Sequence, residues 1–485
     1  MGITFYNTAA RRKQDFEPLT PGKVGMYVCG VTVYDLCHIG HARSAVVFDV
    51  LVRYLRARGF NVTYVRNFTD IDDKIINRAR ELGKDPKEVA ETYIKAFYED
   101  MEPLGVGKAD IEPRATEHIP GMIEMIRTLI ERGHAYVAGG DVLFSVESFP
   151  GYGALSGRRL EDMHAGSRVA VDEKKRHPLD FVLWKAAKPG EPQWESPWGP
   201  GRPGWHIECS VMSNHYLGPS FDIHGGGWDL LFPHHENERA QSIAANGGEF
   251  ARYWVHNGFV TVESEKMSKS LGNFLTIRDA LKEFHPEVLR AFLLSKHYRS
   301  PVDFSRGAVL AIQSGLVRIY RALERVEQAI GPVDRAELRA DFSKNGLPEF
   351  LGRFVEIMDD DLNTAGALGI IFDKVRKINR VMDSASDLGE DGALQLAKER
   401  EELLIAGGIL GLLKREPGHF FDELPKELET SINREEIERL IAERAEARAR
   451  KDWATADAIR ERLKSMGVVV EDTPKGTIWR IDVQA

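Results

Sequence analysis

Residues 29–41 read Cys-Gly-Val-Thr-Val-Tyr-Asp-Leu-Cys-His-Ile-Gly-His and join an apolar strand, 24–28, to a helical pattern that begins at Gly40. A strand that turns into the N-terminus of a helix presents free backbone N–H groups, so this turn is a candidate anion site. A thiol opens the stretch, and two imidazoles, His38 and His41, lie near its end. Taken alone, the stretch fits phosphate handling and an ordinary strand–turn–helix with surface histidines equally well.

The residues that follow predict a parallel crossover unit. Apolar side chains recur at helical spacing over 42–58 and stop at Gly59, and 61–68 alternates like a strand. Strand, helix and strand in this order begin a doubly wound parallel sheet, in which ligands bind outside the carboxyl ends of the strands. The first strand ends near Cys29 and the second near 69–74, so we expect both ends to face one crevice.

The composition is that of a globular protein with about two to four domains. The chain has 485 residues, of which 43% are hydrophobic and 29% charged. A net charge of −9 excludes a global basic field, so any RNA would be held by local patches. Three cysteines are too few for a disulfide framework and fit a reducing compartment. Since no apolar run has signal-peptide or membrane-spanning length, we expect a cytoplasmic protein without membrane contact.

We expect an α/β fold in which a Rossmann-like doubly wound parallel sheet carries an insertion and is followed by a helical bundle and a small C-terminal α+β domain. Clustered glycines and prolines set the insertion apart, and residues 414–430, with two prolines, are typical of a linker. The expected boundaries are 1–106 and 204–260 for the two halves of the sheet domain, 107–203 for the insertion, 261–315 for the region around the polar loop 266–273, 316–413 for the bundle, and 431–485 for the C-terminal domain.

A metal site could be assembled from distant pieces of the chain. His234 and Glu238 are four residues apart, so a helix that starts at Pro233 would point both side chains from one face. Zinc takes such N and O donors together with thiolates, and Cys29 and Cys209 would complete four. The alternative is a helix-surface pair and two buried apolar cysteines.

His224, which precedes three glycines, competes as a metal ligand or could contact a substrate.

Two short motifs and four longer ones resemble a known family. His38–His41 (HIGH) and Lys266–Ser270 (KMSKS) are similar to the two signatures of class I aminoacyl-tRNA synthetases. The stretches CGVTVYDLCHIGHARS, TDIDDK, GRPGWHIECS and FDIHGGGWDLLFPHHENE resemble the cysteinyl-tRNA synthetases, and the similarity covers essentially the whole chain. Both signatures together, in this order around a Rossmann-like pattern, are far more specific than either alone.

The resemblance implies an enzyme that activates L-cysteine with ATP to cysteinyl-adenylate and transfers it to the 3′ end of tRNA(Cys). Positioning and electrostatic stabilisation would carry most of this reaction, and the loop after Lys266 would close over ATP as a lid. The residues that the resemblance assigns to ATP, bound with Mg²⁺, are His38, Gly40, His41, Lys266 and Lys269, of which the two histidines and two lysines are the catalytic groups.

The resemblance also implies one zinc ion per chain, held by Cys29, Cys209, His234 and Glu238, and it removes His224 from the ligands. A metal lowers the pKa of a cysteine thiol, about 8.5 when free, so the substrate would bind as thiolate. A site built for one such donor can reject analogues by roughly 10⁴–10⁵ without editing. We therefore expect no proofreading site in the insertion.

Further contacts are expected with the substrate amino acid. Asp229 suits the α-ammonium group, and Trp205 could form a wall of the pocket or simply pack in the core. The full set of candidates is Thr69, Trp205, His224 and Asp229.

In this family the C-terminal domain, 431–485, would bind the anticodon, and 261–315 would contact the tRNA stem. Residues 431–464 hold nine Lys/Arg and eight Asp/Glu, so no basic run marks an RNA surface. Arginines, aspartates and an exposed Trp can nevertheless contact phosphates and unpaired bases. The candidates are Arg448, Trp453, Asp457 and Asp472, with core packing as the alternative for Trp453.

Two other interpretations share parts of this sequence. A ligase that joins activated cysteine to an amino-sugar, as in mycothiol synthesis, would keep the signatures and the zinc residues but lack the C-terminal domain. A non-catalytic RNA-binding paralogue would keep the scaffold and lose the chemistry, whereas His38, His41, Lys266 and Lys269 are intact. We expect the enzyme, acting as a monomer on ATP, L-cysteine and tRNA(Cys).

Overall fold

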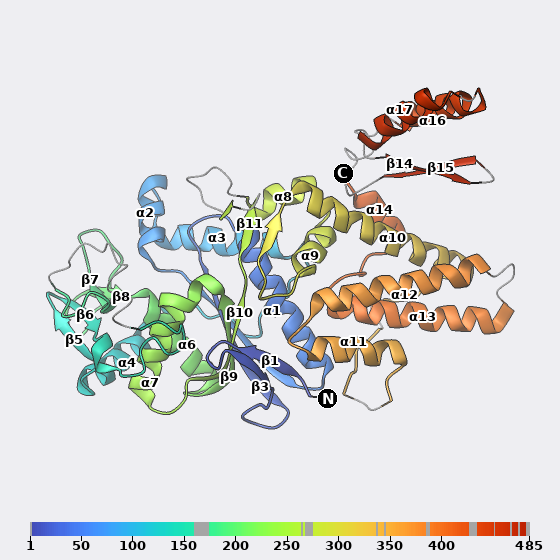
Figure 1. Ribbon diagram of the computed structural model, residues 1–485. Coiled ribbons are helices and arrows are strands. Elements are labelled where there is room, and N and C mark those ends of the chain that lie inside the picture. The colour runs from blue at the N-terminus through green and yellow to red at the C-terminus, as the bar shows by residue number, and fades with distance from the viewer. Residues whose placement is uncertain are drawn as a thin grey trace.

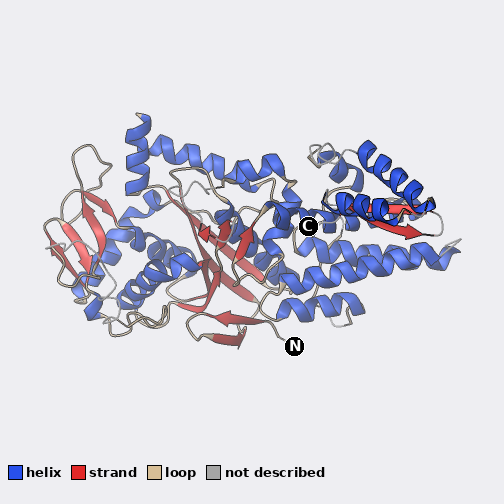
Figure 2. Ribbon diagram, turned by 45° about the horizontal axis from the view of Figure 1, so that its top comes forward, coloured by secondary structure: helices blue, strands red, loops and turns tan. Residues whose placement is uncertain are grey.

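A four-stranded parallel sheet forms the centre of the computed structural model (Figures 1 and 2). Its spatial order is β10 (Ala251–Asn257), β9 (Phe221–Gly227), β3 (Lys23–Thr32) and β4 (Asn61–Thr69). This order confirms the predicted doubly wound sheet. The structure describes residues 2–159, 174–262, 265–266, 275–335, 338–343, 346–384, 389–425, 434–450, 452–465, 468–473 and 476–481.

The strand order reverses between β3 and β9. From β3 the chain crosses through α1 (Ile39–Ala57) to β4 on one side, whereas β9 lies on the other side of β3 and continues to β10. Such a reversal opens a crevice at the carboxyl ends of the two strands, where ligands bind in this fold class. The topology therefore places the ligand-binding edge of the sheet beside the turn that follows Cys29.

Two hydrophobic cores lie on opposite faces of the sheet. Side chains alternate along β3, so Val28 joins the first core and Tyr27 the second. The first core contains α1 and continues into the helical bundle as far as Phe420. The second core contains the insertion, α6 (Trp205–Leu217) and α7 (Glu236–Asn246).

The insertion carries its own antiparallel sheet, drawn at the left of Figure 1. Its strands are β5 (Ala135–Ala138), β6 (Asp141–Phe144), β7 (Phe181–Ala186) and β8 (Gly201–Pro203). Ile111 and Arg114, which lie inside the expected insertion 107–203, still pair with the outer edge of β4. The helices before this sheet are α2 (Asp73–Leu82), α3 (Pro86–Met101) and α4 (Ile119–Glu131).

Two further predicted boundaries fall inside regular elements. The boundary at 260/261 cuts β11 (Val260–Val262), which pairs with β12 (Glu265–Lys266) and β13 (Val302–Phe304). The boundary at 315/316 cuts α10 (Arg306–Ile330), which begins before the apolar spacing at 316–326 and already buries Val309 in its first turns. The other helices of this half are α8 (Ile277–Glu283), α9 (Pro286–Leu294), α11 (Glu349–Asp359), α12 (Thr364–Ser384) and α13 (Gly389–Ile409).

The predicted linker 414–430 contains a helix, α14 (Pro417–Glu423). Phe420 is fully buried and stacks on Tyr320 of α10 with ring centroids 3.9 Å apart, so this part of the linker belongs to the bundle. The small C-terminal domain consists of α16 (Arg434–Ala449), α17 (Trp453–Ser465) and a hairpin of β14 (Val468–Thr473) and β15 (Gly476–Ile481).

At the other end of the chain, β1 (Thr4–Asn7) and β2 (Arg12–Asp15) form a hairpin. None of the described helices combines the length and the apolar character needed to cross a lipid bilayer.

Candidate active site and metal centre

The carboxyl end of β3 bends closely against β4. A side chain at Gly30 would place its Cβ only 1.6 Å from the carbonyl oxygen of Asn67, so this approach requires glycine. The Gly30 backbone N–H donates to Asn67 Oδ1 over 2.9 Å. The bend leaves Cys29, the residue before it, facing the core that contains α6 and α7.

Four donor atoms converge at this point. The Cys29 thiol donates to Glu238 Oε1 over 3.2 Å, and His234 Nε2 lies 2.9 Å from the same oxygen. Cys209 supplies the fourth atom, and all four lie within 4.8 Å of one another. Three helical elements and one strand bring them together: α6 carries Cys209, the short turn Leu231–His235 carries His234, and α7 carries Glu238.

The geometry of the four donors fits a tetrahedral zinc ion. Bonds of about 2.0–2.3 Å separate the ligand atoms of such an ion by roughly 3.3–3.8 Å. The closest donors, at 2.9 and 3.2 Å, would therefore move apart by a few tenths of an ångström. Two sulfurs, one imidazole and one carboxylate are a donor set that zinc accepts.

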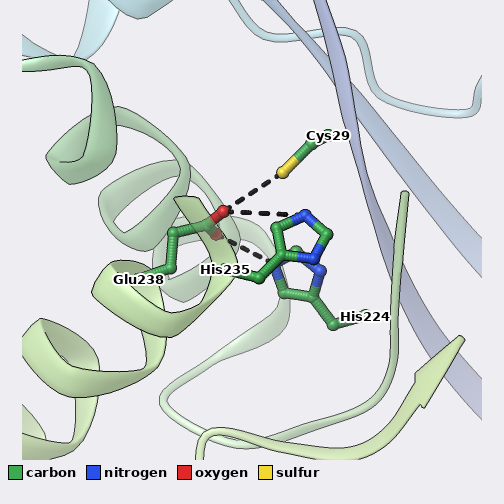
Figure 3. Close-up of side chains that lie close together, drawn as sticks. All are labelled: Cys29, His224, His235 and Glu238. Atoms are coloured by element: carbon green, nitrogen blue, oxygen red, sulfur yellow. Dashed lines mark hydrogen bonds and ion pairs between the residues drawn. The ribbon is translucent and has the colours of Figure 1, made fainter. Parts of the chain in front are cut away.

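A second set of donors overlaps with the first. Figure 3 shows Cys29, His224, His235 and Glu238, which also lie within 4.8 Å of one another. His224 Nε2 is 2.8 Å from Glu238 Oε2, whereas His235 Nε2 is 4.0 Å from Glu238 Oε1. His224 thus binds Oε2 of Glu238, whereas Cys29 and His234 contact Oε1, as a partner that fixes a metal-binding carboxylate would.

Further histidines surround the candidate ligands. His234 Nδ1 lies 2.9 Å from His206 Nδ1, which leaves Nε2 of His234 directed at Glu238. His235 Nδ1 lies 2.8 Å from His256 Nε2, and His256 in turn contacts Thr8 over 2.8 Å. The second ring nitrogen of His234 is therefore held, as it is in most histidine ligands of metals.

The protonation of the donors is strongly coupled. Burial would raise the pKa of Glu238, but His224 and His234 hold it well below its usual range. Burial would lower the pKa of His234, but Glu238 and Cys209 raise it to about 10. A metal ion that binds here must displace the His234 proton, so metal affinity falls as the pH falls.

The two thiols differ in acidity. Burial and the hydrogen bond with Cys209 raise the pKa of Cys29 well above its usual range. Burial would also raise the pKa of Cys209, but the hydrogen bond with Cys29 lowers it to about 6. Cys209 is thus the more acidic of the two thiols.

The HIGH turn presents two histidine N–H groups. His38 is the N-cap of α1: its Nδ1 accepts from the Gly40 N–H over 3.1 Å, and His41 Nδ1 accepts from the His38 N–H over 3.3 Å. A neutral ring that accepts at Nδ1 carries its proton on Nε2. Burial, His38 and Lys74 hold the pKa of His41 well below its usual range, so His41 is a neutral donor rather than a cation.

The same turn is bonded to the segment that follows the KMSKS loop. The Ile39 N–H donates to the Leu275 carbonyl over 3.1 Å, and the Ile277 N–H donates to the Cys37 carbonyl over 3.0 Å. On the other side of the loop, β12 ends at Lys266, whose backbone pairs with Thr261. Lys269 and Gly272 lie outside the described residues, so the structure places the two ends of this loop and not its centre.

The predicted substrate contacts lie in different environments. Thr69 and His224 are buried near the donor cluster, and the Trp205 ring stacks on His234 at 4.2 Å while remaining 36% exposed. Trp205 is therefore not an ordinary core residue. Asp229 is exposed in a short 3₁₀ turn, Trp228–Leu230, after β9.

Two residues of the site were not found from the sequence. Asn67 accepts from the Gly30 N–H, and its Oδ1 lies 3.8 Å from Cys209 Sγ. Glu208 is 1% exposed and accepts from the Thr69 hydroxyl over 2.8 Å. Burial and its acidic neighbours, first Cys209, raise the pKa of Glu208 well above its usual range. No sequence signal marks Asn67, whereas Glu208 adjoins a candidate ligand.

The anticodon candidates lie on or beside α17 and α16. Trp453 is 58% exposed, so the alternative of core packing is wrong. Arg448 and Asp457 are also exposed. Asp472 lies in β14, and nothing about its side chain is described.

Comparisons with known proteins agree with this geometry. The chain is matched over residues 15–314 by the family described as "tRNA synthetases class I (C) catalytic domain", over 353–414 by the "DALR domain", and over 434–480 by the "Cysteinyl-tRNA ligase anticodon binding domain". The chain is a class I aminoacyl-tRNA synthetase.

Full-length relatives show which family within this class the chain belongs to. The chain is 55% identical to the cysteine–tRNA ligase of Syntrophobacter fumaroxidans and 54% identical to that of Pelobacter propionicus, with 99% of this chain and 100% of each relative covered. It belongs to the cysteine–tRNA ligase family.

Solved structures share the fold at low sequence identity. The methionyl-tRNA synthetase of Mycobacterium tuberculosis, solved with methionyl-adenylate, is 18% identical with a TM-score of 0.59, covering 82% of this chain and 93% of that one. LeuRS of Agrobacterium radiobacter, solved with tRNA, is 13% identical with a TM-score of 0.55, covering 83% and 87%.

Proposed function

We propose that the protein activates L-cysteine with ATP, releases pyrophosphate, and transfers the cysteinyl group from cysteinyl-adenylate to the 3′ end of tRNA(Cys). The observation that carries the proposal is the convergence of Cys29, Cys209, His234 and Glu238 within 4.8 Å, at the strand that leads into the HIGH turn. The four donors suit a metal ion that binds sulfur, and the HIGH turn suits the phosphates of ATP.

One zinc ion per chain would be held by Cys29, Cys209, His234 and Glu238. When bound, it would accept the thiolate of the substrate as a ligand and lower the pKa of that thiol, which serine and valine cannot match. His224 would hold Glu238 in its ligating orientation, and Trp205 would cover His234 on the solvent side.

The HIGH turn would orient ATP, bound with Mg²⁺. The Nε2–H groups of His38 and His41 and the N-terminus of α1 can donate to phosphate oxygens as charge moves toward the departing pyrophosphate. Since His41 is neutral, positive charge must come from lysines, and Lys266 and Lys269 are our candidates. The substrate carboxylate then attacks the α-phosphorus without any proton transfer, so positioning carries most of the rate.

The tRNA would extend from this crevice to the C-terminal domain. Arg448, Trp453, Asp457 and Asp472 remain candidates for the anticodon, with exposed Trp453 suited to stack on an unpaired base. We further propose a monomer that works in the cytoplasm.

The test measures metal content and two activities. Wild type should contain one zinc per chain, catalyse cysteine-dependent ATP–pyrophosphate exchange, and charge tRNA(Cys). Cys209→Ala should lose most of the zinc and most of the exchange, whereas Cys37→Ala, which replaces a buried cysteine outside both donor sets, should keep both. Exchange without charging would favour the amino-sugar ligase, and no exchange would favour the binding protein.

A further inference from the structure

Arg43 is a fully buried cation two residues after the HIGH turn, near the start of α1. Its guanidinium group donates only to backbone carbonyls. Nη1 donates to the carbonyl of Leu293 over 3.0 Å, and Nη2 to those of His297, Tyr298 and Ser300 over 3.1, 3.1 and 2.6 Å. One side chain of α1 therefore holds both the end of α9 and the turn 297–300 that follows it.

This arrangement of Arg43 is an expensive way to fill a core. No carboxylate among the described residues forms an ion pair with Arg43, whose acceptors are all carbonyls. Burial lowers the pKa of Arg43 to about 10, so the group keeps its charge at neutral pH. A buried charge without a counter-ion costs free energy that an apolar side chain of similar volume does not. The planar fork of a guanidinium group instead fixes the direction of several hydrogen bonds at once, which suits the holding of a segment.

The turn 297–300 leads to the KMSKS loop through backbone hydrogen bonds. The Tyr298 carbonyl that accepts from Arg43 also accepts from the N–H of Gly258, the residue after β10, over 2.8 Å. Beyond the turn, β13 pairs with β11, and β11 pairs with β12, which ends at Lys266. A continuous set of backbone contacts therefore connects the residues that Arg43 holds with the first lysine of the loop.

The other end of the KMSKS loop is tied to the same helix. The Ile39 N–H donates to the Leu275 carbonyl, as described above. Arg43 supplies the corresponding tie on the side of Lys266. Both ends of the loop are thus fixed relative to α1, whose N-terminus carries the two histidines of the HIGH turn.

We propose that Arg43 is a positioning residue for adenylate formation: it fixes the turn 297–300 against α1 and so keeps the strand that ends at Lys266 in register with the HIGH turn. This rests on the proposed function. Because Arg43 is fully buried, it acts through the backbone that it holds. A displacement of about 1 Å can slow a reaction by about 10²-fold, so a looser turn should lower kcat.

The first test replaces the fork and keeps the charge. Arg43→Lys places its donors on a single nitrogen, which cannot hold Leu293 and the turn 297–300 together as the two guanidinium nitrogens do. The kcat of cysteine-dependent ATP–pyrophosphate exchange should fall by about 10- to 100-fold. The KM for cysteine and the zinc content per chain should stay at wild-type values, because the four metal donors do not contact Arg43.

Arg290→Lys on α9 is the matched control. Arg290 is also buried and also donates to backbone carbonyls, those of Leu104 and Leu410, but it pairs with Asp49 and does not hold the turn 297–300. This variant should lower the melting temperature and leave the kcat of exchange at the wild-type value.

A double-variant cycle separates positioning from a general loss of structure. Lys266→Gln removes a group that the proposal says Arg43 helps to place. If Arg43 acts through the KMSKS loop, Arg43→Lys then costs much less in the Lys266→Gln background than in wild type. The double variant should therefore be only slightly slower than Lys266→Gln alone.

Gly258→Ala perturbs the same turn from the opposite side and leaves Arg43 intact. Its Cβ would lie 2.6 Å from the Arg299 carbonyl oxygen and 2.7 Å from that of Ser300, so the turn must move. This variant should also lower kcat and leave the KM for cysteine unchanged. It tests the proposal even if Arg43→Lys folds poorly.

Three results would overturn the inference. An unchanged kcat in both Arg43→Lys and Gly258→Ala would show that the turn does not position the loop. An equal loss of kcat in Arg290→Lys, or losses that multiply in the cycle with Lys266→Gln, would leave Arg43 a structural role only. If wild type itself shows no exchange with L-cysteine, the proposed function fails together with the inference, whereas the first three results leave the proposed function intact.

Discussion

His224 has two possible roles, contact with the substrate or support of Glu238, and one experiment can distinguish them. The sequence suggests a contact with the substrate, whereas in the structure His224 Nε2 lies 2.8 Å from Glu238 Oε2. His224→Phe removes the donor and retains a ring that can stack on Trp254, where the centroids are now 4.5 Å apart. His224→Gln keeps an N–H donor and is the matched control.

The size of the effect follows from the buried hydrogen bond. Both His224 and Glu238 are fully buried, and a hydrogen bond to a charged group contributes about 1.5–3 kcal/mol, or roughly 10- to 150-fold. Partners of metal ligands typically change metal affinity by about 10- to 100-fold. We therefore expect His224→Phe to raise the zinc dissociation constant by about 10- to 100-fold, and His224→Gln to raise it far less.

Competition with a chromophoric zinc chelator gives the dissociation constants without any assay of activity. The KM for cysteine is then measured at saturating zinc, where it should return close to the wild-type value in both variants. Unchanged zinc affinity in His224→Phe, with a raised KM for cysteine at saturating zinc, would refute this reasoning and restore the direct contact with the substrate.

Three further predictions concern other parts of the chain. The insertion should have no proofreading activity, so mischarged Ser-tRNA should hydrolyse no faster with the enzyme than in buffer; faster hydrolysis would contradict the selection of cysteine by zinc alone. Trp453→Ala should raise the KM for tRNA by about 5- to 100-fold through lost stacking and leave pyrophosphate exchange unchanged; a parallel loss in both assays would indicate a structural role. Burial would raise the pKa of Asp49, but Arg290 and Arg53 lower it to about 2, so Asp49→Asn should reduce the free energy of unfolding by about 2 kcal/mol at pH 7. A carboxyl group whose pKa is lowered on folding stabilises the protein above its unfolded-state pKa, near 3.8, and this stabilisation is lost as the pH falls to the folded-state pKa. The difference in denaturant midpoint between wild type and Asp49→Asn should therefore persist at pH 5 and shrink toward pH 2. A difference that does not depend on pH would argue against the ion pairs.

The sheet could be predicted from the sequence because its signals are local. The apolar run at 24–28 and the alternation at 61–68 correspond to β3 and β4, of which β3 continues to Thr32 and β4 ends one residue later than predicted. The convergence of Cys29 with Cys209 is not local. It depends on the reversal of strand order between β3 and β9, so the residues alone suggested it only as one of two alternatives, and the family resemblance favoured it.

Other features could not be predicted for physical reasons. Asn67 and Glu208 are ordinary polar residues until the close approach at Gly30 and the burial of α6 bring them beside Thr69. The helix in the predicted linker was missed because its prolines are typical of irregular segments. Pro417 instead lies in the first turn of α14, where proline is tolerated.

The alternation along β3 has a consequence for how such a chain can evolve. Val28 packs into the core that continues through the bundle, and Cys29, the next residue, packs against the core of the insertion and α6. A substitution at Cys29 would therefore disturb the packing of the second core, and a substitution at Val28 that of the first. The strand separates the two cores, so evolution can change the packing on one face of the sheet without changing the packing on the other.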